Sequence, residues 1–296
     1  MTSTPPSSPA AAAVAPSLGG RVKVWLGPKN LITAFITLIL VVGEWKFGIV
    51  GGYEKLAATL GVCVGTEILL SLFLLGRWPM IQSSYISGIS LAMLIRPAGG
   101  LFWPFVAGAV LSIASKYVLR MQGRHLWNPS NFGIAVLVLL APAKVAILSH
   151  EFGNDLAANL VIWVVGLLVA SRAKVLHISA TYALCFVLLA LGRSAVAGTP
   201  VLAELAPITG PMYQLMVFFM LTDPRTTVST VKGRMVVVAI IAVVEALIRL
   251  ANDFELPFAE VFAPAPPILA LAIVGPIALA WDLRRRSTAR PDRDAA

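Results

Sequence analysis

The sequence predicts an all-α membrane protein with about ten transmembrane helices, and three observations support this fold class. Hydrophobic residues make up 58% of the 296 residues and charged residues only 12%. The mean hydropathy of +0.86 is therefore far above that of soluble domains. Apolar runs recur at lengths suited to crossing a bilayer, which takes about 20 helical residues. Arginine and lysine lie between these runs, as the positive-inside rule predicts.

Ten apolar runs predict the helices of this fold. The runs at 83–96 and 209–221 are shorter than a full span. In chain order, the predicted helices cover 30–50, 56–76, 83–96, 101–119, 129–148, 155–171, 174–192, 209–221, 233–250 and 263–282.

The charges between the runs favour one orientation, with both termini in the cytoplasm of a bacterial inner membrane. The net charge of +9 then reflects membrane topology, and no nucleic-acid partner is predicted. The predicted inner loops contain Arg77, Arg120, Arg124, Arg172, Lys174, Arg225, Lys232, Arg234, Arg284, Arg285 and Arg286, and the outer loops contain Glu44, Glu54, Glu151, Asp155, Asp253 and Glu255.

Ten helices divide into two similar halves of five. Each half has a short segment that begins near a small polar residue followed by glycine and ends at a proline. Halves with an odd number of crossings must be inverted with respect to each other. The predicted units are a disordered cytoplasmic tail at 1–28, repeats at 29–150 and 151–283, and a basic cytoplasmic tail at 284–296.

Three polar breaks marked by proline fall at predicted helix ends. Asn128 is a strong N-cap residue and Pro129 suits a first helical position, so the fifth helix should begin at Pro129. Converging helix N-termini bind phosphate, carboxylate or polar ring edges. Ordinary caps at the membrane surface are the alternative, which spacing alone favours. The other two breaks are Thr209-Gly210-Pro211 and Thr222-Asp223-Pro224.

Few ionisable residues fall inside apolar runs. Glu67 lies in the middle of one, where a paired or functional role is expected because charge is costly there. Simple hydrogen bonding to a neighbouring helix is the other interpretation. Glu245 and Arg249 are four residues apart and predict an intrahelical ion pair. Lys116 is expected to extend to the inner surface.

The cysteines and histidines predict no metal site. Cys63 and Cys185 lie far apart in apolar runs and predict two free thiols. The three histidines, His125, His150 and His177, show no ligand spacing.

Two motifs resemble a known family. The stretch "GRHLWNPSNFG" at 123–133 and the stretch "FFMLTDPRTTVSTVKGR" at 218–234 resemble its signatures. The family comprises related membrane proteins of two assemblies, the sodium-translocating NADH:quinone oxidoreductase and the Rnf electron-transport complex. Motif order and helix pattern agree from about residue 30 to 283. Stand-alone members labelled enediyne biosynthesis proteins are more similar still. The resemblance implies a urea-transporter-like fold of two inverted five-helix repeats, with a bound flavin.

The resemblance also implies how the flavin would be held. The family attaches one FMN to a threonine between the fifth and sixth helices, but the corresponding segment at 139–160 has no threonine. Thr181 in "HISAT" aligns with the seventh helix and is not its equivalent. A non-covalent flavin, FMN or riboflavin, is therefore expected at the matched positions. These are Asn128, Pro129, Ser130, Asn131, Thr222, Asp223, Pro224, Thr226 and Thr227.

Residues near the eighth helix could add contacts to the flavin ring. Thr209, Gly210, Tyr213 and Gln214 offer polar groups, and the stripe of Tyr213, Phe218 and Phe219 either packs between helices or walls a flat cofactor.

The expected function is that of an electron-transport component in the lipid bilayer. The sequence has no NADH site and no cysteine cluster, so it predicts a subunit that needs a redox or biosynthetic partner protein. The main alternative is a solute or ion channel or transporter, with Glu67 and Asp223 as coupling groups. A second alternative is a membrane anchor for a biosynthetic or redox enzyme.

Overall fold

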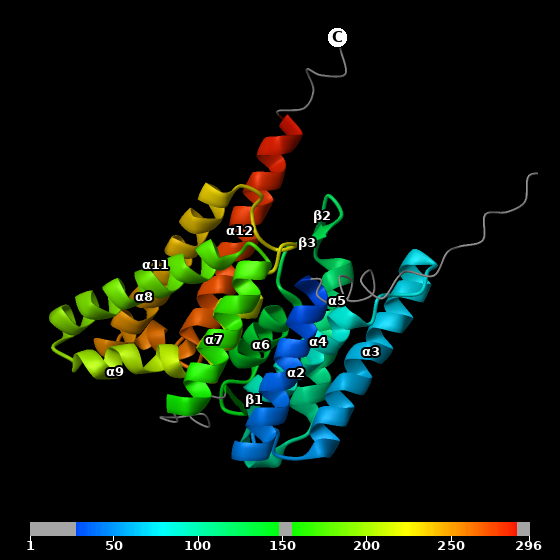
Figure 1. The fold of residues 1–296 in the computed structure, drawn as a ribbon, viewed down its shortest axis with the longest axis horizontal. Coiled ribbons are helices and arrows are strands. Elements are labelled where there is room, and N and C mark those ends of the chain that lie inside the picture. Colours follow the sequence, from blue (N-terminus) through cyan, green and yellow to red (C-terminus); the bar gives the residue numbers. More distant parts are fainter. Residues whose placement is uncertain (1–27, 148–155, 289–296) are drawn as a thin grey trace, which may run out of the picture.

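The computed structural model describes residues 28–147 and 156–288, and these residues are mostly helical (Figure 1). The N-terminal tail, His150, Glu151, Asp155 and the end of the C-terminal tail lie outside them. The helices are α2 (Pro28–Phe47), α3 (Tyr53–Leu75), α4 (Gln82–Leu94), α5 (Trp103–Val118), α6 (Pro129–Leu140), α7 (Leu156–Arg172), α8 (Leu176–Ala197), α9 (Val201–Leu205), α10 (Pro211–Leu215), α11 (Val231–Asp253) and α12 (Pro266–Thr288).

Shorter elements connect these helices. The 3-10 turns are η1 (Ala98–Gly100), η2 (Ala206–Thr209) and η4 (Pro257–Val261), and η3 (Met216–Met220) is a turn of π-helix. The strands β1 (Ile95–Pro97), β2 (Arg120–Met121), β3 (Arg124–His125) and β4 (Val145–Ile147) form two antiparallel ribbons, β1 with β4 and β2 with β3.

Five described helices are long and apolar enough to cross a membrane: α2, α3, α8, α11 and α12. The helical stretches Val201–Thr209 and Met212–Met220, bent by 58°, would form a sixth span if taken together. Helices α5, α6 and α7 are apolar but shorter. The chain is thus a helical protein of the kind that lies in a membrane.

The two apolar runs that are too short for a full span, which form α4 and the α10–η3 segment, have their buried residues in the interior of the protein. Every residue of α4 from Ser87 to Leu94 is buried, as is every residue of η3. The long helices instead expose large apolar side chains such as Phe73 and Trp45. Backbone that does not span the hydrocarbon region is tolerated where protein surrounds it, which explains why these segments can be short.

The predicted fifth helix is wrong at its C-terminal end. The apolar run predicts a helix to residue 148, but α6 ends at Leu140. Pro142 disfavours the helical region for Ala141 and removes an N–H donor. The chain then turns, and β4 pairs with β1 so that Ile147 lies opposite Ile95. The end of the apolar run, which contains β-branched residues, therefore forms a strand rather than more helix.

The two halves of the chain pair their helices in corresponding ways. Helix α3 packs on α5 in the first half, and α8 packs on α11 in the second. Between the halves, α2 contacts α7 and α6 contacts α12. Figure 1 shows α3 and α5 on one side of the molecule and α8 and α11 on the other, with α12 rising between them.

Candidate functional site

Helix α6 begins where the sequence predicts, and we call its N-terminal end, residues 128–131, the α6 entrance. Asn128 has extended backbone, and its Oδ1 accepts a hydrogen bond from the Asn131 N–H at 3.2 Å. Pro129 is the first helical residue, and the Phe132 N–H donates to the Asn128 carbonyl. Pro129 has no N–H. In the first turn of α6, the Ser130 N–H is therefore the one donor that is bonded neither to the Asn128 side chain nor to a backbone carbonyl.

Asp223 joins this entrance to the segment that follows η3. Its Oδ2 accepts a hydrogen bond from the Asn128 amide at 3.3 Å and lies 3.8 Å from His125 Nε2. Its Oδ1 accepts from the Arg225 N–H at 2.9 Å. Burial alone would raise the pKa of the Asp223 carboxyl, but His125 and the Arg225 N–H lower it below its usual value. Asp223 is therefore held as a carboxylate.

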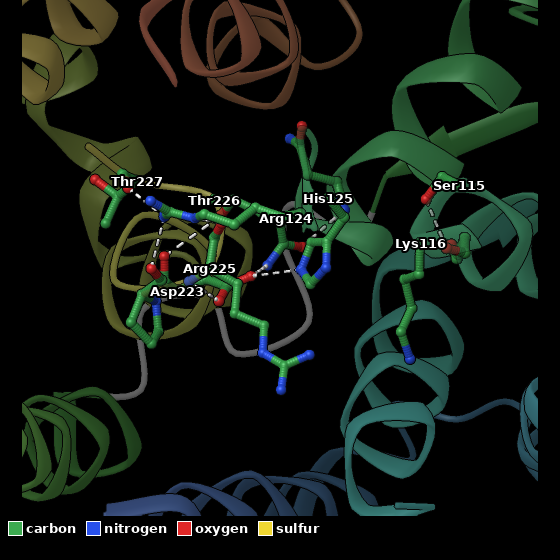
Figure 2. Close-up of polar contacts among 12 residues, drawn as sticks. Ser115, Lys116, Arg124, His125, Asp223, Arg225, Thr226 and Thr227 are labelled. Atoms are coloured by element: carbon green, nitrogen blue, oxygen red, sulfur yellow. Dashed lines mark hydrogen bonds and ion pairs between the residues drawn. The ribbon is translucent and has the colours of Figure 1, made fainter. Parts of the chain in front are cut away.

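Arg124, which precedes α6, also bonds to the segment that follows η3, through backbone carbonyls (Figure 2). Its Nη2 donates to the carbonyls of Pro224 at 2.9 Å and Thr227 at 2.7 Å, and its Nε donates to that of Arg225 at 3.0 Å. The sequence assigned Arg124 to membrane topology and missed this role, because carbonyl partners leave no pattern in the residue types. We call the group of Arg124, His125, Asn128 and Asp223 the entrance cluster.

Behind the entrance cluster, Asn131 links α6 to α12. Its amide nitrogen donates to the Ile268 carbonyl at 2.8 Å, and Trp127 donates to the Ala272 carbonyl at 2.8 Å. The Asn131 side chain is fully buried, but its Oδ1 has no hydrogen-bond partner. An unsatisfied buried acceptor costs about 1–3 kcal/mol, so a donor placed within hydrogen-bond distance of this oxygen would remove that cost.

The threonines near Asp223 bond locally. Thr222 Oγ1 donates to the Phe218 carbonyl at 2.7 Å, and Thr226 Oγ1 donates to the Asp223 carbonyl at 3.4 Å. Thr222 and Thr227 are buried. These contacts shape the turn after η3.

The remaining predicted flavin contacts lie at the other end of the α10–η3 segment. Nine residues separate Tyr213 from Asp223, and the seven of them that lie in α10 and η3 correspond to about 10 Å of helix. Thr209 Oγ1 donates to the Ala206 carbonyl at 2.7 Å, and Gly210 precedes the first residue of α10, as predicted. Gln214 donates to the Thr209 carbonyl at 3.1 Å and to the Asn159 side chain. The predicted positions thus form two groups rather than one.

A first buried charge cluster lies between α3 and α5. The Glu67 carboxylate pairs with the Lys116 ammonium, and Tyr117 Oη donates to Glu67 Oε1 at 2.8 Å. Only 6% of the Glu67 residue surface and 7% of the Lys116 surface is exposed. The prediction that Lys116 extends to the surface is wrong, because a buried carboxylate attracts it more strongly than distant water. We call Glu67, Lys116 and Tyr117 the lysine cluster.

A second buried charge cluster lies between α8 and α11. The Glu245 carboxylate accepts hydrogen bonds from Tyr182, from Tyr213 and from Arg249 Nε, the last at 3.0 Å. Arg249 also donates to Tyr213 Oη. The predicted ion pair of Glu245 with Arg249 is confirmed, but the two tyrosines were missed. We call Glu245, Arg249, Tyr182 and Tyr213 the arginine cluster.

Arg193 borders the arginine cluster. Its guanidinium pairs with the Glu204 carboxylate, and its Nη1 lies 4.0 Å from Asp253 Oδ2. Arg193, Glu245 and Arg249 line a cavity of about 10 Å³, large enough for about one water molecule. A charge inside an apolar helix was the signal that could have identified Arg193.

The aromatic stripe packs against other rings. Phe219 stacks on Phe35 with ring centroids 5.2 Å apart, and Phe218 meets Trp163 edge-on at 5.1 Å. Cys63 and Cys185 are free thiols, as predicted. Within the described residues, no three metal-ligating side chains lie close enough to hold an ion.

The chain matches no protein-family model and no curated protein.

Proposed function

We propose that the protein is a membrane-embedded electron-transport component that binds a flavin non-covalently at the α6 entrance and exchanges electrons with a partner protein. One observation carries the proposal. The two segments that resemble the family motifs lie about a hundred residues apart in the sequence, yet they meet through the hydrogen bond between Asn128 and Asp223. The protein would act as a subunit of a redox complex.

The polar groups near the entrance suit a flavin ring. Such a ring needs an acceptor for its N–H and donors for its carbonyls, and when bound it supplies one- and two-electron chemistry. Asn131 Oδ1 is a buried acceptor without a partner, and the Ser130 N–H is a donor at the helix N-terminus. Neither group gives up a hydrogen bond within the protein when it binds a ligand.

The charges at the entrance favour riboflavin over FMN. A helix N-terminus attracts an anion, but the Asp223 carboxylate already lies beside Asn128 at this end of α6. Since the Arg124 guanidinium nearby already donates to three backbone carbonyls, the phosphate of FMN would meet the like charge of Asp223, whereas riboflavin has no phosphate.

We also propose the finer topology: ten crossings in two inverted repeats, with both termini in the cytoplasm of a bacterial inner membrane. The corresponding packing of α3 on α5 and of α8 on α11 supports the repeat. The entrance cluster then lies at the cytoplasmic side, where a soluble partner can reach it.

The proposal is tested by purifying the protein in mild detergent, adding riboflavin and recording the visible spectrum after removal of free ligand. We expect bound flavin in the wild type and its loss in Asn131→Ala. The matched control is Gln214→Ala, since Gln214 also has a buried oxygen without a partner but lies at the start of α10. Absence of bound flavin in the wild type would refute the proposal.

A solute or ion transporter is the second candidate, favoured by the two buried charge clusters in corresponding helix pairs. Glu67 and Asp223 would then serve as coupling groups. Sealed liposomes that hold the protein should show flux of small solutes or cations if this is correct. A membrane anchor for a biosynthetic or redox enzyme would instead capture one soluble partner and show neither flavin nor flux.

A further inference from the structure

Among the described residues three glutamates are buried, and their partners differ in acid–base chemistry, since Glu204, like Glu245, pairs with an arginine. Glu245 is held by a guanidinium and Glu67 by an ammonium. An arginine stays protonated in proteins, whereas a buried lysine can lose its proton. Only the lysine cluster can therefore become neutral by moving a proton within itself.

We propose that Glu67 and Lys116 form a proton-exchange site inside the membrane protein. The proton of the Lys116 ammonium moves onto Glu67 Oε2. The N–H bond breaks, its electron pair remains on nitrogen, and a lone pair of the carboxylate oxygen forms the new O–H bond. The pair carries no net charge before or after this step, which needs no other reactant.

Burial supplies the reason for the transfer. Separated charges are costly in a low-dielectric interior, and a neutral acid with a neutral amine avoids this cost. Both side chains are more than nine-tenths buried. The Tyr117 hydroxyl at 2.8 Å from Glu67 Oε1 stabilises the carboxylate and so opposes the transfer, which the cost of buried charge favours.

Few other titratable groups act on the lysine cluster, which lies near the C-terminal end of α5. Besides Tyr117, the charged and titratable groups that act on the cluster are Cys63, Arg120 and Arg225. Lys116 lies two residues before the end of α5, which the β2–β3 hairpin follows. Figure 2 shows its side chain apart from the entrance cluster. The lysine cluster therefore lies near the end of α5 that leads into the hairpin.

Infrared spectroscopy of the purified protein tests the proposal, because a protonated carboxyl group has a C=O band that shifts in D₂O. We expect this band in the wild type and its loss in Glu67→Gln. Lys116→Arg should abolish the band as well, since a guanidinium keeps Glu67 ionised. The matched control Glu245→Gln removes the buried carboxylate of the arginine cluster and should leave the band unchanged.

Lys116→Met makes the test independent of Glu67→Gln, which could fail to fold. Without a cation beside it, Glu67 should remain protonated, so the band should persist in Lys116→Met while Lys116→Arg loses it. Absence of the band in the wild type, or its survival in Lys116→Arg, would show a fixed ion pair and overturn the proposal. No outcome depends on flavin binding.

Discussion

The lysine cluster and the arginine cluster each pair a buried carboxylate with a cation, one cluster in each half of the molecule. Each places a carboxylate between corresponding helices, α3 with α5 and α8 with α11, and each surrounds it with a cation and at least one phenol. Glu245 is the more deeply buried, at 1% exposure against 6% for Glu67. The deeper carboxylate has the cation that cannot lose its charge.

This difference shows that similar geometry can support different roles. A guanidinium with several fixed donors holds a permanent charge, which suits a structural contact between α8 and α11. An ammonium is a point charge that can release a proton, which suits exchange. The entrance cluster contains a third type of cationic partner. There Asp223 lies beside the imidazole of His125, which is charged only when protonated.

The largest expected effect comes from removing the cation of each pair. Arg249→Met should destabilise the protein by about 3–5 kcal/mol, because it leaves Glu245 charged and unpaired. Lys116→Met should cost less, because the proposed exchange already leaves Glu67 neutral in part of the wild-type protein. Thermal unfolding in detergent measures both. An equal or larger loss in Lys116→Met would contradict the distinction between the clusters.

The tyrosines sharpen the comparison with a smaller change. Tyr213→Phe removes a donor to Glu245 and the acceptor for Arg249, and we expect a loss of about 1–3 kcal/mol. Tyr117→Phe removes its hydroxyl from Glu67, in a less buried position, and should cost about 0.5–1.5 kcal/mol. The same unfolding assay ranks the two variants, and the reverse order would count against our description of the arginine cluster.

The entrance cluster should depend on pH through Asp223. Its pKa is lowered from the usual 3.8, so the carboxylate contributes stability that is complete above about pH 4 and is lost as pH falls through the lower folded-state pKa. The thermal midpoint of the wild type should therefore approach that of Asp223→Asn as the pH falls below 3.8. A constant difference between them would exclude this contribution.

The smallest effect is expected for Arg124→Lys. The ammonium keeps the charge but cannot reach three carbonyls in the planar geometry of a guanidinium. We expect faster amide hydrogen exchange in 222–230 with little change in the midpoint of unfolding. Unchanged exchange in this segment would show that the carbonyl contacts do not hold the turn.

Local signals allowed much of the fold to be predicted. The Asn128–Pro129 pair marked the start of α6, and glycine followed by proline at 210–211 marked the start of α10. Both depend on conformational preferences of single residues, which a sequence displays directly. The end of α6 was missed because an apolar run suits a buried strand as well as a helix.

The contacts of the candidate site were harder to predict because they join distant segments. Glu67 stood out as a buried charge, but its partner is 49 residues away, and Lys116 alone suited a surface position equally well. Tyr182 and Tyr213 resembled packing residues until their hydroxyl groups met Glu245. Arg124 bonds to backbone carbonyls, which no residue type reveals.

The central functional claim is that the α6 entrance holds a neutral flavin beside the Asp223 carboxylate. Titration of the purified protein with riboflavin and with FMN, followed by flavin fluorescence, tests it directly. We predict tighter binding of riboflavin than of FMN, with the difference reduced in Asp223→Asn because the like charge is gone. Tighter binding of FMN in the wild type, or no binding of either flavin, would contradict the account.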